Sequence, residues 1–100
     1  MKLAIWPRYE LRQAGRRVPL PPHEGLIMTA LLSHREASLD LLVEVVWPHP
    51  DDMPDLWYRS LMVRLHHLRR ALRTFGWTIA VRQGFGWRLV GPSSEGRLAA

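Results

Sequence analysis

The side chains best suited to binding chemistry lie in residues 55–76, DLWYRSLMVRLHHLRRALRTFG. A helix advances about 100° per residue, which gathers on one face the residues Arg59, Val63, His66, His67, Arg70 and Arg73, with Ser60, Arg64 and Arg69 on its flanks. No carboxylate follows Asp55, so this face lacks the opposite-sign (i, i+4) pairs that support most solvated helices. It is therefore suited to an anion, and Val63 at its centre suits a thymine methyl in a DNA major groove.

The other side of the same predicted helix is apolar. Its stripe is formed by Trp57, Tyr58, Leu61, Leu65, Leu68, Leu72 and Phe75. A stripe of this width indicates a helix that packs against a core. Arg69 lies at its border, and the pattern leaves open whether Arg69 forms an ion pair within the fold or belongs to the basic face.

The sequence contains few residue patterns that would support catalysis or metal binding. His66 and His67 are adjacent on the helix and point about 100° apart, so they cannot chelate one ion as an (i, i+4) pair can. No Ser and His form a known nucleophile motif, and the carboxylates lie in a proline-rich loop or on helix surfaces. Gly84 and Gly86 lead into a strand, unlike the glycines of a phosphate loop. We expect no enzyme activity, no metal and no cofactor.

Composition indicates an ordinary folded domain. The chain has 100 residues, 47% hydrophobic and 23% charged, which suits one core. It has no cysteine and hence neither disulfides nor thiolate metal sites. No apolar run approaches a membrane span of about 18 residues, and no signal peptide opens the chain. We expect a cytoplasmic, nucleoid-associated protein.

Charge is divided among segments of the sequence. The net charge is +5, but residues 1–20 carry +4, residues 21–54 carry −5, residues 55–76 carry +4 and residues 77–91 carry +2. Such segregation predicts a basic surface that binds phosphates and an acidic surface that faces proteins.

The predicted elements follow a simple order. Short strands are expected at residues 2–5, 9–12 and 17–20, with a turn at Ala14 and Gly15. Helices are expected at residues 22–34, with Glu24 complementing the helix dipole, and at 39–46, capped by Ser38. Residues 48–54 are predicted to be a loop, Asp55 to cap the long helix and Gly76 to end it. Strands at 77–82 and 87–90 flank a turn at 83–86. The five tryptophans are expected to pack in the core or against the wing, with base stacking as the alternative.

Several motifs in this order resemble the OmpR/PhoB-type DNA-binding domain of bacterial response regulators. Residues 20–24, LPPHE, look like that family's Leu-Thr-Pro-x-Glu, and residues 38–47, SLDLLVEVVW, like its Ser-Arg-Glu-x-Leu-x-x-x-Val-Trp. In the long helix, residues 59–65 and 68–72 are similar to Arg-Thr-Val-Asp-Val-His-Ile and Leu-Arg-Lys-x-Leu. Residues 84–89, GFGWRL, resemble the wing motif Gly-x-Gly-Tyr-Arg-Phe.

The resemblance implies an α+β winged helix-turn-helix over residues 1–91, with a flexible tail at 92–100. It implies a stand-alone domain of bacterial or phage type, without a receiver domain, that binds double-stranded DNA and regulates transcription. The long helix would enter the major groove, and the hairpin at 82–88 would act as the wing. The DNA-binding residues expected are Arg59, Ser60, Val63, Arg64, His66, His67, Arg70, Arg73, Arg82, Gln83 and Arg88.

Departures from the family pattern leave alternatives open. Gly25 stands where the family usually has an aromatic residue, Met62 replaces an aspartate, and Arg82 with Gln83 replaces Val-Arg. The basic face can instead dock an acidic protein, or the chain can be a small modulator of the transcription machinery. RNA polymerase contact through Asp51 and Asp52 and a homodimer on DNA are further expectations.

Overall fold

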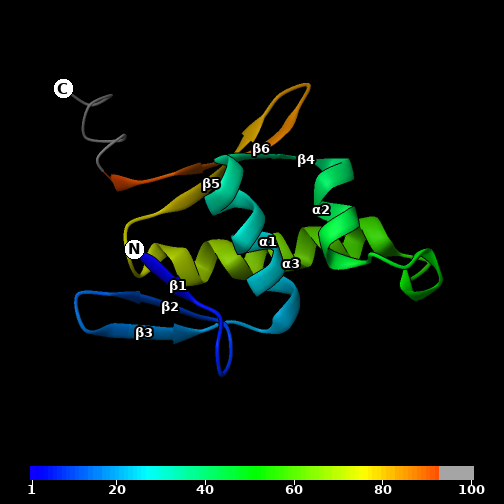
Figure 1. The fold of residues 1–100 in the computed structure, drawn as a ribbon. Helices are drawn as coiled ribbons and strands as arrows, with labels where there is room; N and C mark the ends of the chain where they lie inside the picture. The colour runs from blue at the N-terminus through cyan, green and yellow to red at the C-terminus, as the bar shows by residue number, and fades with distance from the viewer. Residues whose placement is uncertain (93–100) are drawn as a thin grey trace.

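Three α-helices and two three-stranded antiparallel sheets form the fold in the computed structural model, which describes residues 1–92 (Figure 1). The predicted α+β class is confirmed. Within residues 1–92, no helix has both the length and the apolar composition needed to cross a membrane. The tail expected at 92–100 lies outside the described residues apart from Pro92.

The N-terminal sheet consists of β1 (Lys2–Ala4), β2 (Glu10–Gln13) and β3 (Arg16–Pro19), in the order β1-β2-β3. The turn between β2 and β3 has positive φ values of 51° at Ala14 and 81° at Gly15, as a tight hairpin requires. The predicted turn is therefore confirmed. Leu11, near the centre of β2, is fully buried. The face of the sheet that carries Leu11 therefore packs against the core.

Two helices follow with the predicted bounds. The first, α1 (Pro22–His34), has proline in its first turn, where a missing N–H does no harm. The second, α2 (Leu39–Val46), begins at Ser38, whose Oγ accepts a hydrogen bond from the Leu41 N–H at 3.1 Å. The predicted N-cap is confirmed.

Gly25 allows the N-terminal sheet to approach α1. A Cβ at this position would lie 2.1 Å from Cγ of Tyr9. The ring of Tyr9 thus packs directly on the helix backbone. A glycine inside a helix is unfavourable by about 1 kcal/mol, but this contact requires it.

The start of the long helix differs from the prediction. Helix α3 spans Trp57–Arg73, its N-cap is Leu56, and no side chain caps it. The segment expected to be a loop contains the 3-10 turn η1 (Pro50–Asp52), closed by a hydrogen bond from the Met53 N–H to the Pro50 carbonyl at 3.1 Å. Proline fixes the φ angle that starts such a turn. Asp55 is therefore not the cap of α3.

The end of α3 agrees with the prediction. Gly76 has a φ of 77°, and its N–H donates to the Arg73 carbonyl at 3.1 Å. The N–H of Trp77 donates to the Leu72 carbonyl, also at 3.1 Å. These two bonds form a Schellman motif, in which a left-handed glycine satisfies the last carbonyls of a helix.

The second sheet contains a strand that the sequence did not reveal. The predicted hairpin is present as β5 (Thr78–Arg82) and β6 (Gly86–Val90), but β4 (Glu36–Ser38), between α1 and α2, pairs with the free edge of β6. The strand order is β4-β6-β5. A strand of three residues has almost no periodicity, and its partner lies about fifty residues away in the sequence.

The core lies between the helices and the inner faces of both sheets. Leu61, Leu65, Leu68 and Leu72 of α3 are fully buried, which confirms most of the predicted stripe. Tyr58 was assigned to that stripe, but its side chain is 53% exposed. It lies in the first turn of α3, where its ring meets the half-buried Trp57 ring edge-on, with the ring centroids 5.7 Å apart. Tyr58 is therefore not a core residue.

Candidate functional site

One face of α3 is exposed and basic. Among its predicted site residues, six are exposed: Arg59, Val63, His66, His67, Arg70 and Arg73. Helix α3 contains no acidic side chain. Among the described residues, Arg59, Arg70 and Arg73 have no carboxylate within ion-pair distance. The structure thus brings a run of unneutralised cations together along this helix, which we call the α3 basic face.

An open, mainly apolar hollow of about 360 Å³ lies at the N-terminal end of this face. It is lined by Pro54, Leu56, Arg59, Ser60, Val63 and Arg64. Val63 is 44% exposed and Leu56 is 68% exposed, so the hollow presents apolar surface beside cations. The sequence pattern identified four of these residues as site residues and missed Pro54 and Leu56. The sequence analysis began the long helix at Asp55, whereas α3 begins at Trp57, so the residues just before the helix were not considered for the site.

Glu24 lies beneath the α3 basic face. This residue of α1 is only 2% exposed, and its carboxylate is 3.8 Å from Nη1 of Arg64 and 3.7 Å from Nδ1 of His67. Glu24 lies in the first turn of α1, where it was expected to complement the helix dipole, and its carboxylate also faces two residues of α3. An acid of the middle segment therefore lies at the basic face, contrary to the expected separation of charges.

These contacts are longer than hydrogen bonds. Oε2 of Glu24 and Nε of Arg64 are both buried and have no hydrogen-bond partner among the described residues. A buried carboxylate without hydrogen bonds is unfavourable, because the attraction of the neighbouring Arg64 guanidinium only partly replaces its lost hydration. Arg64 and His67 are thus partly committed to Glu24 and are less free than the rest of the basic face.

Arg69 takes a role that the pattern left open. Its Nε donates a hydrogen bond to the carbonyl of Ile79 at 2.8 Å, which ties α3 to β5. The partner is a backbone oxygen rather than a carboxylate. Of the two alternatives left open for Arg69, the structure supports a role within the fold, through a backbone carbonyl rather than an ion pair.

The hairpin residues predicted for the wing are only partly free. Nη1 of Arg82 forms an ion pair with the carboxylate of Glu36 on β4, across the intervening strand. Arg88 lies directly opposite Glu36 in the register of β4 and β6, and it is exposed. Gln83 is exposed at the turn, which projects away from the helices (Figure 1). Arg82 is thus engaged within the fold, whereas Gln83 and Arg88 remain accessible.

The acidic residues near α3 form no metal site. Asp51 and Asp52 are exposed on η1. Within residues 1–92, no group of three or more His, Asp or Glu side chains is arranged to hold a metal ion.

Comparison with known proteins adds no assignment. No family model matches the chain, and no curated protein is significantly similar to it.

Proposed function

We propose that the protein binds double-stranded DNA as a winged helix-turn-helix and regulates transcription. The observation that carries the proposal is the α3 basic face: an exposed helix face with arginines, histidines and a central valine, and with no acidic residue on the helix. Cations of this kind neutralise phosphates, and a helix has the diameter to enter a major groove. The order of elements is compatible with this reading.

The residues divide into two roles. Val63 and the apolar hollow beside it suit a thymine methyl, which is the apolar feature of the major groove. Arg59, His66, Arg70 and Arg73 suit phosphates or base edges. Gln83 and Arg88 on the hairpin suit a neighbouring minor groove, as expected of a wing. Arg64 and His67 can contact DNA only when their side chains move away from the Glu24 carboxylate.

The proposal is tested with a double variant at the C-terminal half of α3. We expect Arg70→Gln with Arg73→Gln to weaken binding to mixed duplex fragments at least about tenfold at low salt, and to lower the slope of log affinity against log salt by about 1 per lost phosphate contact. Fluorescence anisotropy over a salt series measures both quantities.

A matched control removes the same charge elsewhere. Arg16→Gln with Arg35→Gln also deletes two exposed arginines, but neither lies on α3. If both double variants lose affinity equally, only net charge matters and the α3 interface is wrong. Absence of duplex binding by the unaltered protein at low salt would instead favour an acidic protein as the partner of the basic face.

Glu24 offers a second test, because it lies beneath the DNA-facing side of α3. We expect Glu24→Gln to raise duplex affinity severalfold and to increase the salt slope by about 1, since the change removes a negative charge and releases Arg64 toward phosphate. The same anisotropy series measures the change, and circular dichroism confirms that the variant is folded. A fall in affinity would show that Glu24 holds Arg64 and His67 in their binding positions.

A further inference from the structure

A row of like charges crosses the outer face of the N-terminal sheet. Arg12 on β2 lies opposite Lys2 on β1 and opposite Arg17 on β3 in the strand register. Opposed residues in an antiparallel sheet point to the same face, and adjacent strands are about 4.8 Å apart. Three cations therefore stand side by side, an arrangement that is unfavourable unless an anion compensates it.

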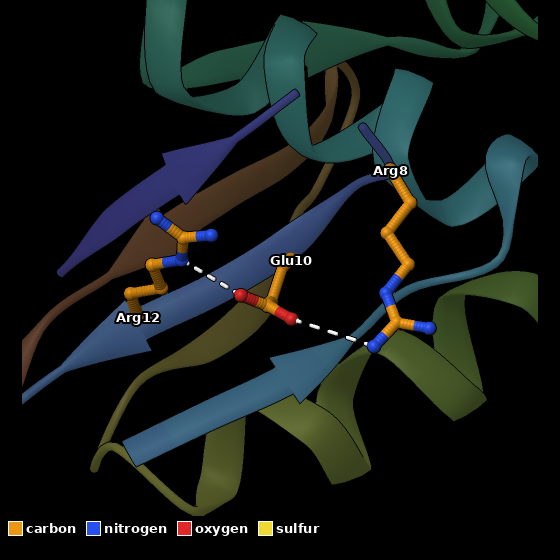
Figure 2. A network of polar contacts seen from close by, with 3 residues as sticks. All are labelled: Arg8, Glu10 and Arg12. Carbon is orange, nitrogen blue, oxygen red and sulfur yellow. Dashed lines mark hydrogen bonds and ion pairs between the residues drawn. The ribbon is translucent and has the colours of Figure 1, made fainter. Parts of the chain in front are cut away.

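Carboxylates of the fold only partly neutralise the positive charge of this row. Glu10 accepts a hydrogen bond from Nε of Arg12 at 2.7 Å and lies 3.8 Å from Nη2 of Arg8 (Figure 2). The hydrogen bond from Arg12 is the main reason that the pKa of Glu10 lies below its ordinary value, so the carboxylate is charged at neutral pH. A single negative charge thus lies among Arg8, Arg12 and Arg17, and Lys2 stands beside Arg12 without a carboxylate of its own among the described ion pairs. Both terminal nitrogens of Arg12 point away from Glu10 in Figure 2.

A hollow and an exposed aromatic ring accompany this row. Pro7, Arg8, Glu10, Arg12 and Arg17 line a hollow of about 320 Å³. Trp6 immediately precedes Pro7, and its side chain is 85% exposed, while its neighbour Ile5 is 59% exposed. The other four tryptophans are buried or half-buried, so the predicted packing role is confirmed for them and is wrong for Trp6. An isolated, exposed tryptophan has no packing role in this fold.

We propose that the outer face of β1-β2-β3, together with the exposed Trp6 in the connection between β1 and β2, binds single-stranded nucleic acid. Proteins that bind single strands combine cations that follow the phosphate backbone with aromatic side chains on which bases stack. Lys2, Arg12 and Arg17 supply the first feature, and Trp6 supplies the second. Guanidinium groups also match phosphate oxygens with two parallel hydrogen bonds.

The shape of the patch favours a strand over a single anion. The cations form a line that spans three strands of the sheet, and a line of charges complements a linear polyanion. The patch lies on the N-terminal sheet, whereas the proposed duplex interface lies on α3. The two surfaces belong to separate elements, so this inference does not depend on the proposed binding of duplex DNA.

The test uses variants that keep the ion pairs of Glu10 with Arg8 and Arg12. Lys2→Gln with Arg17→Gln leaves the pairing of Arg12 and Glu10 intact, and Trp6→Ala removes the exposed ring. We expect each variant to weaken binding of a labelled 12-residue oligothymidine about tenfold. The charge variant should also lower the salt slope by roughly 0.7 for each lost phosphate contact. Removal of like charges from the row should leave the melting temperature unchanged or higher.

Matched controls separate this site from α3. Arg16→Gln with Arg35→Gln removes the same charge, and Arg16 faces the opposite side of the sheet because it pairs with Gln13. The double variant Arg16→Gln with Arg35→Gln should retain oligothymidine affinity. The double variant Arg70→Gln with Arg73→Gln should retain it as well. Ile5→Ala is the control for Trp6→Ala, since it removes a neighbouring apolar side chain without removing a stacking surface.

Three results would overturn the proposal. The first is failure of the unaltered protein to bind oligothymidine at low salt. The second is equal loss of affinity in the sheet variants and the charge-matched control. The third is unchanged affinity in Trp6→Ala together with binding of polyglutamate as tight as that of oligothymidine, which would assign the face to an acidic protein. Duplex binding by the same sheet variants is measured in parallel, so that failure of either proposed site is recognised separately.

Discussion

Gly86→Ala is expected to lower the free energy of unfolding by about 3 kcal/mol. A Cβ at Gly86 would lie 2.2 Å from the carbonyl oxygen of Ala37 and 2.9 Å from Cα of Ser38, both in the backbone of β4. Backbone atoms held in a strand cannot rotate away as a side chain can, so β4 and β6 must separate. For a domain of this size, the melting temperature should fall by roughly 12–24 °C.

Gly84→Ala is the control, because it tests the turn without the close approach. Gly84 has a φ of 81°, and nothing lies within 4 Å of the position that a Cβ would take. Its substitution should cost about 1 kcal/mol from backbone strain alone. Thermal melting followed by circular dichroism compares the two variants. Equal losses would show that strand contact at Gly86 contributes nothing beyond conformational strain.

The second large effect is expected at Leu65 in the middle of α3. Its side chain is fully buried among the core residues. Leu65→Ala removes buried apolar contacts and leaves a cavity that the surrounding side chains only partly fill, which typically lowers the free energy of unfolding by 2–5 kcal/mol, or about 3 kcal/mol here. Chemical denaturation with urea measures the loss.

Val63→Ala, two residues away, should behave in the opposite manner. Val63 is 44% exposed, so its truncation should change stability by about 0.5 kcal/mol or less. If Val63 contacts a thymine methyl, the variant should lose about 1–3 kcal/mol of binding to the preferred duplex and little to random duplex. Equal losses on both duplexes would remove Val63 from the base-reading role, and a large loss of stability would place it in the core.

Much of this fold follows from local sequence. Proline at the start of α1, Ser38 at the start of α2 and glycine at the end of α3 each act through the backbone of their immediate neighbours, so they mark helix ends reliably. The spacing of Leu61, Leu65, Leu68 and Leu72 assigns the buried side of α3, and the exposed basic residues opposite follow from the same periodicity.

Other features are decided by distant parts of the chain. Strand β4 exists because the free edge of β6 needs a hydrogen-bonding partner, and Gly86 is glycine because that partner comes so close. Gly25 looks unfavourable in a helix until the ring of Tyr9 is placed against it. Periodicity within one segment carries no information about such contacts.

Charge pairing follows the same division. The sequence determined that α3 carries cations without acids, because both properties belong to one segment. Only the tertiary structure decided that Glu24 reaches Arg64 and His67, that Glu36 engages Arg82, and that three cations share one row of the N-terminal sheet. Coulomb attraction depends on the distance between charges in space, and for residues on different elements that distance is set by how the elements pack.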